Sequence, residues 1–113
     1  DTLEACDDLE EEILDRFGDL PNPVQNLIQI ARIKVLARFV GISTISAEKN
    51  VFVLKLLEGL RLDNTLYAKI ARKYRGKVSY RHGRIPQLRV EKDQEDRSAL
   101  AFLAEVLMDI HNE

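Results

Sequence analysis

The sequence is poor in several residue types, and each shortage excludes a class of protein. The 113 residues include one cysteine, Cys6, so no disulfide can form within the chain, and a reducing, cytoplasmic setting is expected. No apolar run reaches the roughly 18 residues that a membrane span needs. No charged segment followed by an apolar one opens the chain as a signal sequence would. Because it starts at Asp1 and its only methionine is Met108, we expect a piece of a larger polypeptide.

Residue patterns typical of enzymes are also missing. The five glycines are scattered and form no phosphate-binding loop. Cys6, His82 and His111 are far apart and lack the paired spacing of metal ligands. The acidic residues near the start suggest no enclosed site in which a carboxyl pKa would be raised for acid–base chemistry. We therefore expect no catalytic, metal or cofactor site in this chain.

What the chain does have is the composition of one globular domain, spanning residues 1–113. Hydrophobic residues make up 45% and charged residues 32%. The net charge of -2 conceals a segregation. Residues 1–19 hold nine acids against Arg16, whereas residues 61–92 hold ten bases against Asp63 and Glu91. This asymmetry indicates either two binding surfaces of opposite sign or segments that neutralise each other or are simply solvated.

The first 41 residues are predicted to form two helices joined by a sharp corner. In residues 3–17, Cys6, Leu9, Ile13 and Phe17 line one face at helical spacing. The opposite face gathers acids, among them Asp8, Glu11, Glu12 and Asp15. Gly18 is a typical left-handed stop, after which Leu20 can fold back onto the apolar face.

The second helix is predicted over residues 23–40. Asn22 is a natural N-cap, Gln25 can complete a capping box, and Pro23 suits the first helical position. Gly41 is its expected stop. Its apolar residues are too numerous for one stripe, which predicts a central helix contacted on more than one side.

Two hairpin–helix units are predicted next, at 42–75 and 77–112. In the first, "ISTIS" and "VFVLKLL" flank a polar turn, and Asp63 or Asn64 caps a helix that Gly76 ends. In the second, "KVSYR" and "IPQLRV" flank "HGR", Pro86 suggests an edge or bulged strand, and Asp93 caps the last helix. The fold class is therefore α+β: two N-terminal helices followed by a four-stranded antiparallel sheet with packed helices.

Two surfaces are candidates for binding. The basic stretch 61–92 interleaves Tyr67, Tyr74 and Tyr80, a pattern that can bind single-stranded nucleic acid, although Tyr74 and Tyr80 also fall at core positions. The acidic face of residues 3–17 is either a solvated helix or a surface for a basic partner. Asp15 favours the partner, because an acid in the last turn of a helix opposes its dipole.

Residues 9–42, "LEEEILDRFGDLPNPVQNLIQIARIKVLARFVGI", resemble the C-terminal domain of bacterial transcription–repair coupling factor. The motif rests on an acidic helix, an Ile-Ala-Arg helix, and the corner residues Arg16, Phe17, Gly18, Leu20, Pro21 and Pro23. Beyond Ile42 the likeness persists only as the hairpin–helix pattern. The unusually basic stretch 61–92 departs from the family.

The resemblance implies a regulatory role within a larger protein. The parent is an ATP-dependent DNA translocase that acts on stalled RNA polymerase and recruits the damage-recognition protein excinuclease A. The domain would be non-catalytic and autoinhibitory, masking the excinuclease-A-binding surface of the parent's N-terminal excinuclease-B-like module. Glu12 and Asp15 match the family's contacting acids, with Asp8 and Glu11 on the same face. The alternative is a nucleic-acid-binding accessory domain that uses residues 61–92; a small enzyme is disfavoured.

Overall fold

The computed structural model describes residues 2–19, 21–60, 63–92 and 98–112. Two helices, α1 (Leu3–Phe17) and α2 (Asn22–Val40), come first. Strands β1 (Ile42–Ala47) and β2 (Val51–Leu56) form a hairpin, followed by α3 (Asn64–Lys73). A second hairpin, β3 (Val78–Arg81) and β4 (Gln87–Glu91), precedes α4 (Ala99–His111). The predicted α+β class and the order of elements are confirmed.

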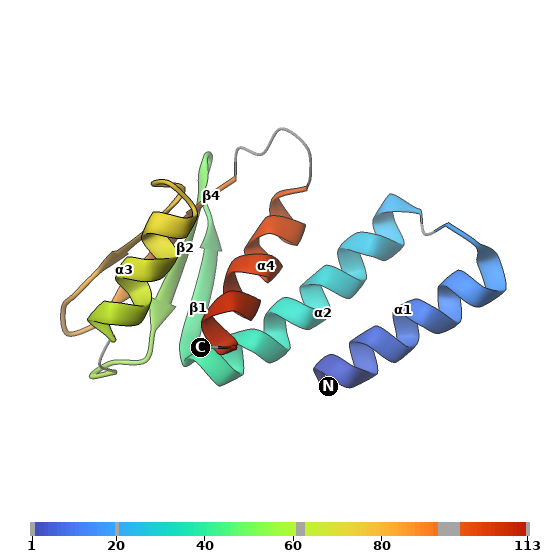
Figure 1. Cartoon of the computed structure of the whole chain (residues 1–113), viewed down its shortest axis with the longest axis horizontal. Helices are drawn as coiled ribbons and strands as arrows, with labels where there is room; N and C mark the ends of the chain where they lie inside the picture. The colour runs from blue at the N-terminus through green and yellow to red at the C-terminus, as the bar shows by residue number, and fades with distance from the viewer. Residues whose placement is uncertain (1, 20, 61–62, 93–97, 113) are drawn as a thin grey trace.

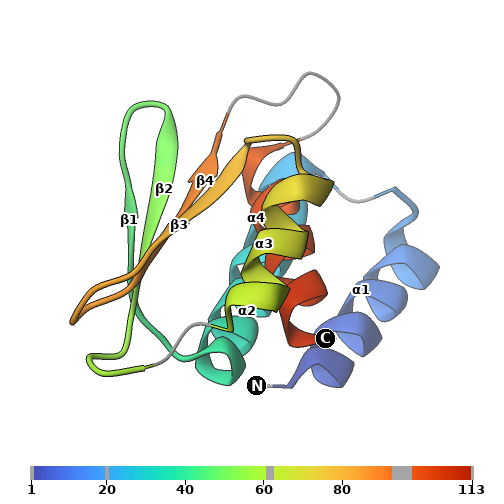
Figure 2. The same ribbon diagram turned by 60° about the vertical axis from the view of Figure 1, so that its left-hand side comes forward.

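The four strands form one antiparallel sheet in the order β1-β2-β4-β3. Helices α2, α3 and α4 lie on one face of the sheet, and α1 packs on α2 on the side away from it (Figures 1 and 2). The β2–β4 pairing joins the two predicted hairpin–helix units into a single sheet, with Leu54 opposite Leu88.

Alternating side chains explain why only one face of the sheet is covered. Strand residues turned toward the helices are apolar and buried, as Leu54, Leu88 and Val90 are, each with no exposed surface. Of the residues between them, Lys55 and Ser79 are exposed, whereas Val53 is buried. This period-two pattern is typical of an antiparallel sheet with one solvated face. The buried face packs against helix residues that include Leu36 and Leu107.

Helix α2 is central, as predicted, because it packs against α1, α4 and β1. Its predicted cap is wrong: Pro21 is the N-cap residue and no side chain caps the helix. Pro21 and Pro23 have no N–H to satisfy, and the N–H groups of Val24 and Gln25 donate to the Pro21 carbonyl at 3.0 Å. A side-chain cap from Asn22 is therefore not needed. The predicted stop at Gly41 is confirmed, with φ 90° and ψ 32°.

Three further predictions need correction. The strand after Pro86 is neither an edge strand nor bulged: β4 lies between β2 and β3, and Pro86 precedes it with its carbonyl accepting from the Leu56 N–H at 2.9 Å. A proline without an N–H is tolerated at that position. The last helix starts at Ala99 and is capped by Ser98, whereas Asp93 lies outside the described residues. Helix α3 is capped by Asp63 as predicted but ends at Lys73, and Arg75 adopts a positive φ before Gly76 does.

Candidate functional site

Helix α1 presents the four acids predicted to bind a partner. Its first turn is capped by Thr2, whose hydroxyl oxygen accepts the Ala5 N–H at 3.0 Å. At 100° per residue, the four acids occupy roughly 100° of the helix circumference. All of them are exposed: Asp8, Glu11, Glu12 and Asp15. The structure therefore brings the predicted residues together on one solvent-facing strip, which we call the acidic strip.

One member of the acidic strip has a partner within the helix. Arg16 Nη2 lies 3.2 Å from Glu12 Oε1, and both side chains are more than half exposed. This pairing, one turn back from Arg16, was not predicted from the sequence. An exposed pair at this spacing contributes little to stability, about 0.3–0.5 kcal/mol. Glu12 therefore remains accessible to a stronger cationic partner.

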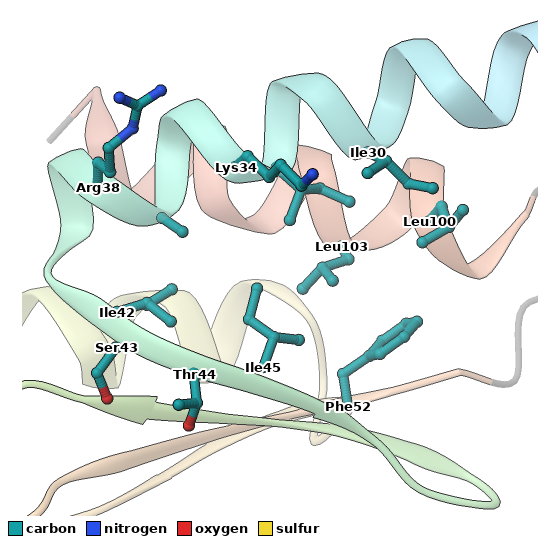
Figure 3. Close-up of a pocket in the computed structure, with 12 residues that line it drawn as sticks. Ile30, Lys34, Arg38, Ile42, Ser43, Thr44, Ile45, Phe52, Leu100 and Leu103 are labelled. Carbon is teal, nitrogen blue, oxygen red and sulfur yellow. The ribbon is translucent and has the colours of Figure 1, made fainter. Parts of the chain in front are cut away.

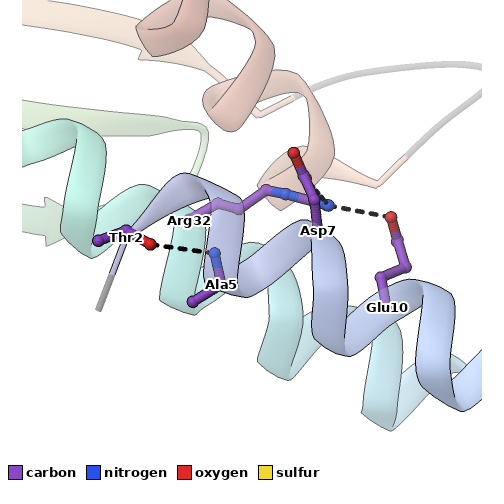
Figure 4. Close-up of polar contacts among 5 residues, drawn as sticks. All are labelled: Thr2, Ala5, Asp7, Glu10 and Arg32. Atoms are coloured by element: carbon purple, nitrogen blue, oxygen red, sulfur yellow. Dashed lines mark hydrogen bonds and ion pairs between the residues drawn. The ribbon is translucent and has the colours of Figure 1, made fainter.

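Two other acids of α1, Asp7 and Glu10, hold the helix in place. Arg32 of α2 donates from Nη2 to Asp7 Oδ1 at 2.7 Å and to Glu10 Oε1 at 2.9 Å (Figure 4). We call this contact the Arg32 clamp. Only 14% of the Arg32 side chain is exposed. Burial by itself would lower the pKa of Arg32, but the two carboxylates outweigh it and raise that pKa.

The Arg32 clamp was not predicted, although the sequence carries a signal for it. Arg32 follows Ile28 by four residues and precedes Val35 by three, so it shares a helix face with two buried side chains. A base on a buried face requires an acidic partner. The clamp also divides the acids of α1 by role: Asp7 and Glu10 bind Arg32, whereas the acidic strip points away from α2.

The apolar face of α1 is less buried than predicted. Cys6 is its only buried residue, whereas Leu9 is 49% and Phe17 75% exposed. The reason is that α1 packs mainly on α2, with Leu3 against the core, and makes no layer with the sheet (Figure 2). Helix α1 is therefore attached through few apolar contacts, and the Arg32 clamp carries much of its attachment.

The corner after α1 contains the remaining motif residues. Gly18 has φ 78° as predicted, but its ψ of -142° is not that of a left-handed helix. Its N–H donates to the Leu14 carbonyl at 2.9 Å and ends the helix. Arg16, Phe17, Pro21 and Pro23 are all exposed, and Leu20 lies outside the described residues. The corner thus follows an exposed Phe17, which lies on the face of α1 opposite the acidic strip.

The basic stretch does not assemble a stacking surface in the described residues. Tyr67 and Tyr74 are buried, and Tyr80 is partly buried with its ring 5.8 Å from that of Tyr67. Two of its bases are paired, Lys73 with Asp109 at 2.6 Å and Arg84 with Glu58 at 3.1 Å. Burial and the hydrogen bond to Asp109 raise the pKa of Tyr74. These tyrosines therefore serve the core, as their positions in the sequence also allowed.

In the described ranges 2–19, 21–60, 63–92 and 98–112, no group of three or more His, Cys, Asp or Glu side chains could hold a metal ion. No described helix is both long and apolar enough to cross a bilayer.

The comparisons with known proteins bear on this arrangement. The sequence model of the TRCF domain matches residues 1–67, more than half of the chain. The chain belongs to the TRCF domain family. The matched region contains α1, the corner, α2 and the first hairpin, so the whole acidic strip of this TRCF domain lies inside it. The resemblance inferred from residues 9–42 is thereby confirmed.

Two known proteins are similar to this TRCF domain. It is 35% identical over 57 residues to the transcription-repair-coupling factor of Bacillus subtilis (strain 168), a match that covers 50% of this chain but 5% of that protein. Its fold is similar to the crystal structure of a C-terminal domain of transcription-repair coupling factor, with a TM-score of 0.70 and 21% identity. That match covers 99% of this chain and 74% of the other. The likeness of fold therefore extends well beyond the matched residues 1–67.

Proposed function

We propose that this domain is a non-catalytic, autoinhibitory interaction domain of a transcription–repair coupling factor. The acidic strip binds arginines of the parent's N-terminal excinuclease-B-like module and so masks the surface that excinuclease A would bind. Release of the domain would then be coupled to recruitment of excinuclease A when the parent meets stalled RNA polymerase on DNA. The family membership of residues 1–67 supports the parent's identity.

The proposal is supported by a difference among the acids of α1: two of them bind Arg32 within the domain, and the others do not. Asp7 and Glu10 bind Arg32 within the domain, whereas Asp8, Glu11 and Asp15 are exposed and form no ion pair with the described residues. Asp15 also opposes the helix dipole, so its presence is not explained by the stability of α1. Charges clustered in this way suit a basic surface, and a desolvated pair at such an interface can be worth a few kcal/mol.

The alternative, a nucleic-acid-binding accessory domain, has less support. Single-strand binding needs exposed aromatic rings beside the bases. Tyr67 and Tyr74 are buried, and Lys73 and Arg84 already contact acids. A salt titration against DNA separates the two functions, because a binder of phosphates weakens steeply as the salt concentration rises.

The test reverses two charges of the strip in the full-length parent. Glu12→Arg with Asp15→Arg should loosen the masking contact and increase capture of excinuclease A in a titration. The matched control is Glu48→Arg with Glu58→Arg, which makes the same charge change on exposed residues and likewise breaks one exposed ion pair, Glu58–Arg84.

Melting curves of the 113-residue chain complete the design. Both double variants should melt close to the wild type, since all four substituted residues are exposed. A strip variant that folds normally and captures no more excinuclease A than the wild type refutes the proposed masking. Equal gains in the strip and control variants would refute it as well, since total charge would then be the cause.

A further inference from the structure

A second surface lies on the other side of α2 from the acidic strip, and it is apolar and basic. A groove of about 410 Å³ runs between α2 and β1, with α4 beneath it. Ile30 and Leu100 line one end with Phe52, Ile45 lies midway, and Ile42 and Arg38 lie at the other end (Figure 3). We call this the α2–β1 groove. The buried core residues Ile33, Phe52 and Leu103 contribute to its lining, and it lies between a helix and a strand rather than between loops.

The strand beside the groove has a free edge. Among the described residues, β1 pairs only with β2. Its six residues, "ISTISA", include no charge and no proline, and its register is regular from Thr44 to Ala47 after an irregularity at Ser43. Natural edge strands are usually protected against pairing by charges, prolines or short length. The opposite edge, β3, follows that rule: it has four residues, ends in Arg81 and packs against α3.

Two cations stand on the rim of the groove. Lys34 and Arg38 are exposed, four residues apart on α2, and have no ion-pair partner in the part of the chain that the structure describes. Like charges at this spacing repel each other, although Arg38 in the last turn of α2 favours the helix dipole. They also disfavour a second copy of the chain in the groove, because edge-to-edge pairing would bring the same cations together.

The geometry points to one occupant. We propose that the α2–β1 groove binds an extended protein segment that pairs with β1 and carries one apolar and two acidic side chains at alternate positions. Alternate residues of a strand lie about 6.7 Å apart on one face. Lys34 and Arg38 are separated by about 6 Å along the helix axis, so two such acids match the two cations. The apolar side chain then enters the end lined by Ile30, Ile45 and Phe52.

In this mode of binding, different contacts supply affinity and specificity. Main-chain hydrogen bonds to the free edge of β1 supply affinity for any extended segment, and the groove and its cations select the side chains. The inference is independent of the acidic strip, which lies on α1 and has the opposite charge. The domain would thus hold two partners of opposite sign, one on each side of α2.

The probe is a labelled seven-residue peptide with isoleucine, glutamate and glutamate at alternate positions and threonine between them, made in both orders. Binding to the 113-residue chain is followed by fluorescence polarisation at low salt. Lys34→Gln with Arg38→Gln should weaken it by roughly two- to thirtyfold, as expected for two exposed ion pairs. The control, Arg72→Gln with Lys77→Gln, removes the same charge elsewhere and should change binding less than about twofold. All four residues are exposed, so both variants should fold.

Two further measurements test whether the peptide pairs with β1 and whether it is the peptide that occupies the groove. A peptide with a central proline should fail to bind, because it cannot donate to the edge of β1. Amide resonances of Ser43, Thr44 and Ile45 should shift on binding. A second cleft, between α1 and α2, is lined by Cys6 and Leu9 and shares Lys34 and Arg38 with the groove. The proposal is overturned if a peptide with glutamine in place of glutamate binds equally well, if the shifts map to that second cleft, or if no peptide binds. Self-association through β1 in sedimentation would also overturn it, by making a second copy the occupant.

Discussion

Replacing Arg32 by methionine should release α1 from α2 without unfolding the core. Methionine keeps most of the apolar stem but removes both hydrogen bonds of the clamp, at 2.7 and 2.9 Å. Hydrogen bonds to charged groups contribute about 1.5–3 kcal/mol each when buried. Asp7 is 64% exposed and Glu10 32%, so solvent screens them. We therefore expect the free energy of local opening to fall by about 1–2 kcal/mol in total.

Cys6 supplies the assay. It is the only cysteine, it is 7% exposed, and it is the one buried residue of α1. Cys6 lines the cleft between α1 and α2 and is largely covered in the closed state, so a thiol reagent reacts faster when α1 opens and the labelling rate rises with the opening equilibrium. A change of 1–2 kcal/mol corresponds to labelling that is roughly five- to thirtyfold faster. Raising the salt concentration should accelerate the wild type and leave the Arg32→Met variant nearly unchanged.

Arg16→Met is the matched control for this experiment. It also removes an arginine that binds an acid of α1, but the Arg16–Glu12 pair lies within the helix and not between helices. Its labelling rate should stay within about twofold of the wild type. If Arg32→Met labels no faster than Arg16→Met, the clamp does not hold α1, and our account of its attachment is wrong.

Two further predictions concern the corner and the acid stability of the domain. Gly18→Val should lower the free energy of unfolding by about 1–3 kcal/mol in denaturant titrations, because φ 78° with ψ -142° is strained for a β-branched residue; an unchanged midpoint would show that the corner relaxes freely. Burial alone would raise the pKa of Asp109, but Lys73 and Tyr74 outweigh it and lower that pKa. The ionised Asp109 therefore stabilises the fold above the ordinary carboxyl pKa of about 3.9, and this stabilisation is lost as the pH falls below that value. Asp109→Asn should therefore lose less unfolding free energy than the wild type between pH 5 and pH 3, and parallel losses would contradict the assignment.

Local patterns accounted for most of the fold. Helix limits such as Gly41 and the polar turn between β1 and β2 depend on neighbouring residues, which the sequence displays directly. The errors arose where contacts between segments that are distant in the sequence determine the structure. Pro86 suggested an edge strand, yet β4 is interior because β2 pairs with it from more than thirty residues away along the chain. Strand order depends on such contacts, and periodicity within one segment carries no information about them.

The candidate site shows the same contrast between features set by neighbouring residues and features set by distant ones. The grouping of Asp8, Glu11, Glu12 and Asp15 follows from helical spacing alone, and the structure places them on one exposed strip. Which acids were already engaged was not predictable in this way, because Arg32 reaches Asp7 and Glu10 across 25 and 22 residues of sequence. The exposure of Phe17 was also missed, since the helical pattern marks an apolar face but not what covers it.

The position of β4 has a consequence for how the chain reaches this fold. The hairpins β1–β2 and β3–β4 close over short loops, whereas the β2–β4 pairing must also enclose α3 and β3. Closing the longer loop costs more chain entropy and is the slower step. Until it occurs, β2 keeps an open edge that carries Phe52, Val53 and Leu54, a short apolar run of high β-propensity. We infer that this run is the stretch most exposed to aggregation during synthesis, and that rapid docking of the second hairpin is what protects it.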